Sequence, residues 1–347
     1  MEMEAFEHLL LRFASALAAR KAAMRRITGD EPEFIALSDF VRAEREIISV
    51  EEPLGYDRET SQFKVENRML APRIQVLMWL MLDAVHYVFH EDRCLESQSL
   101  DASNILVSRR TLQPVFGELS LTAKSPDRVQ SNMTSLATIF ETTILGSSSV
   151  PPPFEVTHLI QLMKGDAAAM LFLIWVHPCL VPMLNRATYL STMEWHVWGM
   201  MRRDDREGFE YVLRSPSFHE NWDSWVAENT YLKRSYDDAD EPYDPQGVRT
   251  GTPPAQEVLR YIANVPGWGM LCDADSACQT EDGRRTLPGW FNRTDSARMI
   301  YSVMHALLVS MAESFQRLGQ LRHMKLEFLF PGREIEEEAD DSWIPAV

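Results

Sequence analysis

The apolar positions of residues 72–89 recur every three or four residues along the chain. This spacing places them on one face of a helix and predicts that the helix lies against the core. The face comprises Ile74, Leu77, Met78, Met81, Leu82, Val85, Val88 and Phe89. The polar residues His90, Glu91 and Asp92 come next, and we expect the helix to end there.

The residues before this helix show a less regular pattern. Apolar side chains at helical spacing predict one helix over residues 1–28 and a shorter helix over residues 33–49. The stretch 50–72 is polar and irregular, with Gln62–Val65 as its best candidate for a strand. We therefore expect a mainly helical N-terminal region over residues 1–70.

Two short apolar runs follow the long helix and are separated by a polar turn. The first run is Ile105–Val107, and the second is Pro114–Phe116, which leads into Gly117. Short runs rich in Val, Ile and Phe and bounded by turn residues are typical of a pair of strands. Further helices are predicted over residues 131–141, 155–164, 167–176, 185–200, 257–264 and 297–318.

The composition is that of a soluble globular protein, with 45% hydrophobic and 24% charged residues. A net charge of −17 argues against broad binding to nucleic-acid backbones, although a local basic pocket remains compatible with it. The apolar runs are too short or too interrupted to cross a bilayer, and the N-terminus carries Glu2, Glu4 and Glu7, unlike a signal peptide. We expect a cytoplasmic protein that does not contact a membrane.

The four cysteines give no metal site. Cys94, Cys179, Cys272 and Cys278 lack the spacing of a zinc ligand set. We interpret them as reduced thiols, with a bridge between Cys272 and Cys278 as the alternative. No cofactor is predicted.

The long helix, the loop around Asn104 and the strand pair occur in the order found around the catalytic loop of protein kinases, which this stretch resembles. In kinases, His-Arg-Asp supplies the base before this loop and Asp-Phe-Gly binds metal after it. Here Ser97-Gln98-Ser99 and Glu118-Leu119-Ser120 occupy those places. The resemblance implies a truncated kinase-like C-lobe over residues 71–178, with a vestigial nucleotide site at Asn104 and Glu118. An asparagine there would equally tie loop backbone groups together.

Residues 179–330 resemble the kinase-extension nuclease (KEN) domain of two families. These are the stress-sensor kinases of the unfolded-protein response and the interferon-induced latent ribonuclease. The resemblance implies an all-helical ribonuclease-related domain, followed by an acidic tail over residues 331–347. It is carried by the order of the predicted helix 185–200, Asn221–Trp225, Glu257–Asn264, Leu287–Phe291 and the predicted helix 297–318.

That family cleaves RNA without a metal, by attack of the 2′-hydroxyl on the adjacent phosphate. The reaction requires a general acid or base and a cation that holds the phosphate. The resemblance places the family's Asp at Glu257, its Arg at Ala263, its Asn at Asn264, its His at Trp268 and its Tyr at Thr250. Neither Ala263 nor Trp268 can hold a phosphate or donate a proton.

We therefore expect a catalytically impaired pseudokinase and pseudoribonuclease that acts as a regulatory or scaffolding protein. Because the family's ribonucleases act as dimers, the expected partner is a second copy or an intact relative. The alternative is an active endoribonuclease in mRNA processing or decay, with RNA as partner and Asn264, Glu257 and Arg260 as catalytic residues. That site could instead use Arg249, together with one of the histidines at 196, 219 and 305. A third interpretation is a nucleotide sensor that uses Asn104 and Glu118.

Overall fold

A computed structural model describes ten segments of the chain, most of them helical, so the expected mainly α class is confirmed. The segments are residues 34–44, 46–51, 67–96, 100–117, 120–214, 226–227, 233, 236–237, 254–264 and 306–330. Several predictions lie outside them. These concern the helix over 1–28, the strand at Gln62–Val65, the motifs Asn221–Trp225 and Leu287–Phe291, and the acidic tail.

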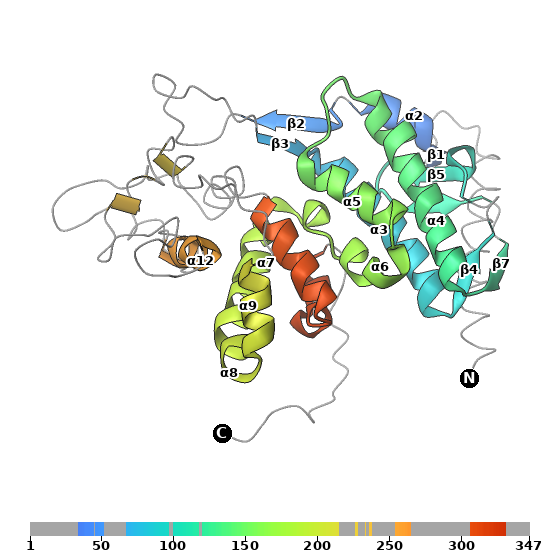
Figure 1. Ribbon diagram of the computed structural model, residues 1–347. Helices are drawn as coiled ribbons and strands as arrows, with labels where there is room; N and C mark the ends of the chain where they lie inside the picture. The colour runs from blue at the N-terminus through green and yellow to red at the C-terminus, as the bar shows by residue number, and fades with distance from the viewer. Residues whose placement is uncertain are drawn as a thin grey trace.

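Helix α3 (Pro72–His90) is the longest helix described and lies in the middle of the core (Figure 1). It begins with Pro72, whose fixed φ suits the first turn of a helix. The chain leaves it through Asp92, which has a left-handed φ of 53°. All eight side chains of the predicted apolar face are at most 1% exposed. The prediction of this helix and of its buried face is confirmed.

The strand pair after α3 is an antiparallel hairpin of β5 (Ile105–Ser108) and β6 (Pro114–Phe116), as predicted. Ile105 pairs with Phe116, and Val107 pairs with Pro114. On its other side β5 pairs with β1 (Phe34–Ala36), which gives a sheet in the order β1-β5-β6. A separate pair joins β4 (Arg93–Leu95) to β7 (Leu121–Ala123).

The prediction of one helix over residues 33–49 was wrong. The helix there, α2 (Leu37–Ala43), is preceded by β1 and ends at Glu44, whose backbone is extended. Residues from Ile48 onward belong to β2 (Ile48–Glu51), which pairs with β3 (Asn67–Leu70) inside the stretch predicted as irregular. These strands depend on partners far along the chain, a dependence that local spacing does not reveal.

Three helices follow the strands and pack against one another (Figure 1). Helix α4 (Pro126–Ile139) begins at Ser125, whose Oγ accepts a hydrogen bond from the Arg128 N–H. It continues through a π-helical turn (η2, Phe140–Ile144) and a 3₁₀ turn (η3, Leu145–Ser147). Helices α5 (Phe154–Lys164) and α6 (Ala167–Trp175) lie within one residue of their predicted limits.

The rest of the described chain is helical. The predicted helix 185–200 corresponds to α7 and its π-helical continuation η5. The predicted helix 257–264 lies within α12. Residues 306–317 form part of the predicted helix 297–318. We refer to residues 306–317 as the C-terminal helix. The elements are η4 (Pro178–Leu180), α7 (Met183–Trp195), η5 (His196–Met201), α8 (Arg202–Asp204), α9 (Arg206–Arg214), α12 (Pro254–Asn264), η6 (Leu321–Met324) and η7 (Leu326–Leu329).

One cluster of buried side chains extends from Leu37 in α2 to Phe330 after η7. The segments on either side of His177 therefore share a hydrophobic core. At this junction Trp79 of α3 stacks on Phe330, with ring centroids 5.4 Å apart. None of the helices described is both long and apolar enough to span a membrane.

Candidate functional site

The loop that contains Asn104 is held by the side chain of Asp101 and by a backbone bond to the end of β6. Asp101 begins the 3₁₀ turn η1 (Ala102–Asn104), and its Oδ1 accepts hydrogen bonds from Ser103 N at 2.7 Å and Ser103 Oγ at 2.6 Å. These two bonds hold the pKa of Asp101 below its usual value. The carbonyl oxygen of Asn104 accepts the Gly117 N–H at 2.7 Å, which ties the loop to the end of β6.

The predicted vestigial nucleotide site, Asn104 with Glu118, lies only partly within the described residues. The backbone contact brings Asn104 next to Gly117, the neighbour of Glu118 in sequence, while Glu118 itself lies outside the described residues. The contact uses main-chain atoms of Asn104, a role that does not require an asparagine side chain.

The predicted nuclease residues Glu257, Arg260 and Asn264 are three or four positions apart on α12 and share one side of the helix. Arg260 donates from Nη2 to Oε2 of Glu257 at 3.0 Å, and the Glu257 side chain is only 7% exposed. Val258 and Leu259 beside them are buried in the core. Asn264 is the last residue of α12, and its side chain lies outside the description. The structure thus brings Glu257 and Arg260 together as an ion pair in which the carboxylate is largely buried and the Arg260 side chain is 31% exposed.

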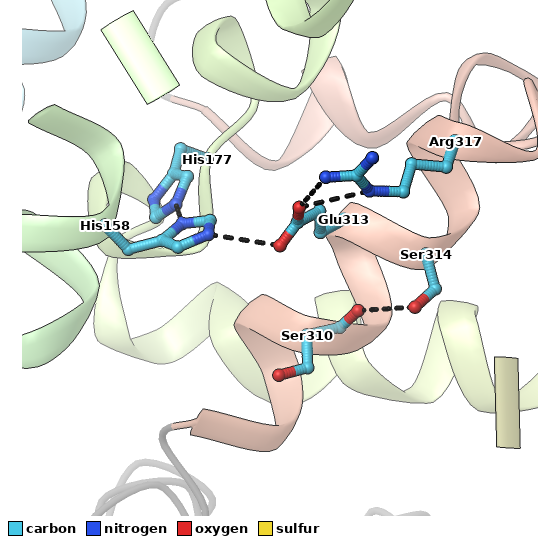
Figure 2. A network of polar contacts seen from close by, with 6 residues as sticks. All are labelled: His158, His177, Ser310, Glu313, Ser314 and Arg317. Atoms are coloured by element: carbon cyan, nitrogen blue, oxygen red, sulfur yellow. Dashed lines mark hydrogen bonds and ion pairs between the residues drawn. The ribbon is translucent and has the colours of Figure 1, made fainter. Parts of the chain in front are cut away.

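A second group of polar side chains joins three distant segments, and sequence reasoning did not predict it. His158 comes from α5, His177 precedes η4, and Glu313 belongs to the C-terminal helix (Figure 2). His158 Nδ1 lies 3.0 Å from His177 Nε2, and His158 Nε2 lies 3.3 Å from Glu313 Oε2. Arg317, one turn after Glu313, donates to its Oε1 at 2.6 Å and 3.1 Å. We call Cys179, His177, His158, Glu313 and Arg317 the polar chain.

The hydrogen bonds of the polar chain have a defined direction. The Cys179 N–H donates to His177 Nδ1 at 3.3 Å, so this nitrogen carries no proton. His177 Nε2–H then donates to His158 Nδ1, and His158 Nε2–H donates to the Glu313 carboxylate. These tautomers follow from the partners at each end of the chain.

The surroundings of the polar chain favour neutral histidines. Burial lowers the pKa of His158, while the Glu313 carboxylate opposes that shift. Burial, together with the neighbouring His158 and Arg186, lowers the pKa of His177 well below its usual value. Partial burial opposes ionisation of Glu313, but the bonds from Arg317 and His158 outweigh it and lower the pKa of Glu313. The chain thus joins two neutral rings to a charged carboxylate.

The loop behind His177 is fixed by two long polar side chains. Gln75 Nε2 donates to the carbonyl oxygens of Cys179 at 2.7 Å and Val181 at 2.9 Å. Arg186 donates to the same two oxygens, from Nη2 at 3.2 Å and from Nε at 3.0 Å. Its Nη1 lies 3.7 Å from Oε1 of Glu155, and both side chains are at most 3% exposed. The carbonyls of Cys179 and Val181 therefore have two side-chain donors each.

No family model, curated protein or solved structure matches this chain.

The chemistry available at the polar chain follows from its geometry. Cys179 Sγ lies 3.2 Å from His177 Nδ1, a distance that suits a cysteine nucleophile and its base. However, Cys179 is fully buried, and this burial raises the pKa of its thiol well above the usual value. A buried neutral thiol is unreactive, so the arrangement favours a structural role.

Metal binding is not indicated in the described part of the chain, where no group of three or more His, Cys, Asp or Glu side chains could hold an ion. His196, considered above for the alternative nuclease, is 8% exposed and packs edge-on against Phe315 at 5.6 Å. The sequence offered one weak signal for the polar chain, the His177-Pro178 dipeptide, which gave no indication of its partners.

Proposed function

We propose that this protein is a catalytically impaired pseudokinase and pseudoribonuclease that works as a regulatory or scaffolding partner of a second copy or of an intact relative. The proposal rests mainly on the ion pair that two residues of the nuclease signature form on α12. Its carboxylate, Glu257, is largely buried and paired with Arg260. The pair gives the buried carboxylate a counter-ion and engages the Arg260 guanidinium, so the ion pair has a structural role within α12.

Residues replaced in the sequence support the same proposal. Ala263 and Trp268 stand where the resemblance implies a phosphate-binding cation and a proton donor. Arg260 lies one helical turn before Ala263, and moving it into that role would break its pair with Glu257. A serine at position 99 cannot act as the base that an aspartate provides in kinases, because a hydroxyl does not accept a proton near neutral pH.

The order of elements agrees with the proposed ancestry. A long helix is followed by a hairpin, three helices, and a further helical region that begins at His177-Pro178. This is the sequence of elements that the kinase and KEN resemblance implies. The frame of the fold is therefore compatible with a protein that kept the scaffold of an enzyme and lost its chemistry.

Cleavage of a fluorescently labelled RNA stem-loop tests the proposal. The wild type should leave the RNA intact in EDTA at tens of micromolar protein. Asn264→Ala and the matched control Gln256→Ala, also on α12, should give the same result. Cleavage by the wild type and by Gln256→Ala, but not by Asn264→Ala, would instead establish the endoribonuclease alternative.

Association is the positive part of the proposal, and sedimentation velocity measures it. We expect either a concentration-dependent dimer or a complex with an added intact kinase and ribonuclease of the resembling family. A chain that stays monomeric at tens of micromolar and binds no such relative would contradict the scaffolding role.

ATP with magnesium should leave the melting temperature unchanged. A rise that is lost in Asn104→Ala would favour the nucleotide sensor.

A further inference from the structure

The polar chain is a titratable part of the attachment of the C-terminal helix. Two other contacts of the segment 306–330 are made by groups whose charge does not change with pH. Gln316 Nε2 donates to the carbonyl oxygen of Ala169 in α6 at 2.8 Å, and Asn185 Nδ2 of α7 donates to that of Leu329 at 2.6 Å. The contact between His158 and Glu313 differs from these because one partner can gain a proton near neutral pH.

The two ends of the polar chain determine how many protons it holds. At one end, the backbone N–H of Cys179 is a donor that cannot change. At the other end, the ionised carboxylate of Glu313 can only accept. Each ring between them must therefore accept on one nitrogen and donate on the other, which requires both histidines to be neutral. In this state the Cys179 N–H, the contact between the two rings and the contact with Glu313 are all made at once.

An added proton breaks this arrangement. If His158 becomes charged, its Nδ1–H points at the Nε2–H of His177, 3.0 Å away. If the His177 proton moves to Nδ1 in response, it can bond to Cys179 Sγ, 3.2 Å away, but the backbone N–H of Cys179 then loses its acceptor. A buried N–H without a partner is destabilising, so proton uptake weakens the junction whichever nitrogen receives the proton.

We propose that the polar chain is a pH-sensitive latch, in which protonation of the His158–His177 pair loosens the C-terminal helix from α5 and from the loop before η4. Figure 2 shows that the latch is made where the C-terminal helix faces α5.

The direction of the effect follows from the histidines. Both have pKa values below their usual value of 6.5 when the chain is folded. The opened state therefore binds more protons below about pH 6.5, and the attachment is strongest above this value and weakens as the pH falls from there. Each proton taken up on opening increases the opening constant about tenfold per pH unit in that window.

Other charged groups near the latch do not set this window. Arg186 from α7 faces His177, and its charge is matched by Glu155 of α5. Glu313 and its partner Arg317 stay charged in this range, because the pKa of Glu313 is lowered and that of Arg317 is raised.

Two further histidines lie near the latch, and one of them, His323 of η6, belongs to the segment 306–330 itself. His196 of η5 packs against Phe315, and burial and His323 lower the pKa of His196, while a hydrogen bond with Gln320 opposes that shift. Since His196 also contacts the C-terminal helix, the experiment must separate its contribution from that of the latch.

Hydrogen exchange of peptides from residues 306–317, followed by mass spectrometry and corrected for the intrinsic rate, tests the latch. From about pH 7 to pH 5.5 the opening constant of the wild type should rise about tenfold or more. His158→Gln should clearly reduce this rise, because one of the two titrating rings is removed, while the glutamine carbonyl oxygen can accept from His177 and its amide can donate to Glu313. His196→Gln and the exposed control His90→Gln should keep most of the rise. The proposal would be overturned if the opening constant of His158→Gln rose with falling pH as much as that of the wild type, or if this rise disappeared in His196→Gln.

A measurement on the unaltered protein covers the case in which His158→Gln does not fold. Nitrogen chemical shifts of ¹⁵N-labelled histidine report the tautomer and charge of each ring. At pH 7.5 both His158 and His177 should be neutral, with the proton on Nε2. A charged ring, or a proton on Nδ1 of either residue, would be incompatible with the latch.

Discussion

Arg186→Met should be among the most destabilising single substitutions in the described core. The guanidinium makes two hydrogen bonds to the loop before α7 and pairs with Glu155. The loop carbonyls keep a donor in the variant, because Gln75 also bonds to both of them. The main loss is thus the counter-ion of Glu155, a carboxylate whose side chain is only 3% exposed.

The magnitude follows from what Glu155 can do once it is alone. Removing one partner of a buried pair typically costs about 3–5 kcal/mol. The carboxyl group limits this cost by taking up a proton, which for an ordinary glutamate costs about 3–4 kcal/mol at pH 7 and about 1 kcal/mol at pH 5. We therefore expect Arg186→Met to lower the free energy of unfolding by about 3–4 kcal/mol at pH 7 and by clearly less at pH 5.

Urea unfolding followed by circular dichroism at both pH values measures this difference. Arg206→Met is the control, since Arg206 pairs with Glu210 on the surface with 88% of its side chain exposed, and should cost well under about 1 kcal/mol. The double variant Arg186→Met with Glu155→Met should be more stable than Arg186→Met alone, because no buried charge is left. A loss for Arg186→Met that is the same at both pH values would refute the reasoning.

Three further predictions concern other parts of the fold. Leu77→Ala, at a fully buried position of α3, should destabilise the protein by about 2–5 kcal/mol in urea unfolding, whereas Tyr87→Ala, 40% exposed on the same helix, should cost much less. Asp101→Ala removes the cap of η1 and should cost about 0.5–1 kcal/mol at pH 7. Because the folded pKa of Asp101 is lowered from 3.8, this difference should shrink as the pH falls below about 4, measured by the same unfolding assay. Cys179 should react with iodoacetamide about a hundredfold more slowly than in urea-unfolded protein, as judged by mass spectrometry of its peptide.

The helices were predictable because their signal is local. In α3 and α5 apolar residues recur over three turns or more. Polar residues or prolines mark their ends, so the spacing and the stop signals agree. Strands of three or four residues contain no such repeat. Ile35 in β1 is defined by its pairing with Val107, and Val50 in β2 by its pairing with Arg68. Such partners are known only once the chain has folded.

The candidate site was harder to predict for the same reason. The three side chains at the centre of the latch are scattered along the chain, with His158 and Glu313 separated by 155 positions. Each alone has the pattern of an ordinary helix or loop residue. The pair of Glu257 and Arg260 is local, and the signature did place both residues on one helix. The burial of Glu257 depends on which segments pack against α12, and the spacing of the signature residues gives no information about those segments.

A physical reason connects the well-predicted frame with the lost chemistry that we propose. The loop around Asn104 is held by the carboxylate of Asp101 and by the main-chain hydrogen bond from Gly117 to Asn104. The hairpin that follows is held by main-chain pairing and by buried apolar side chains such as Ile105. None of these interactions uses a side chain that a kinase needs for catalysis. Selection for catalysis and selection for this fold therefore act on different atoms. A chain that serves as a binding partner can keep the fold after the catalytic side chains have been replaced.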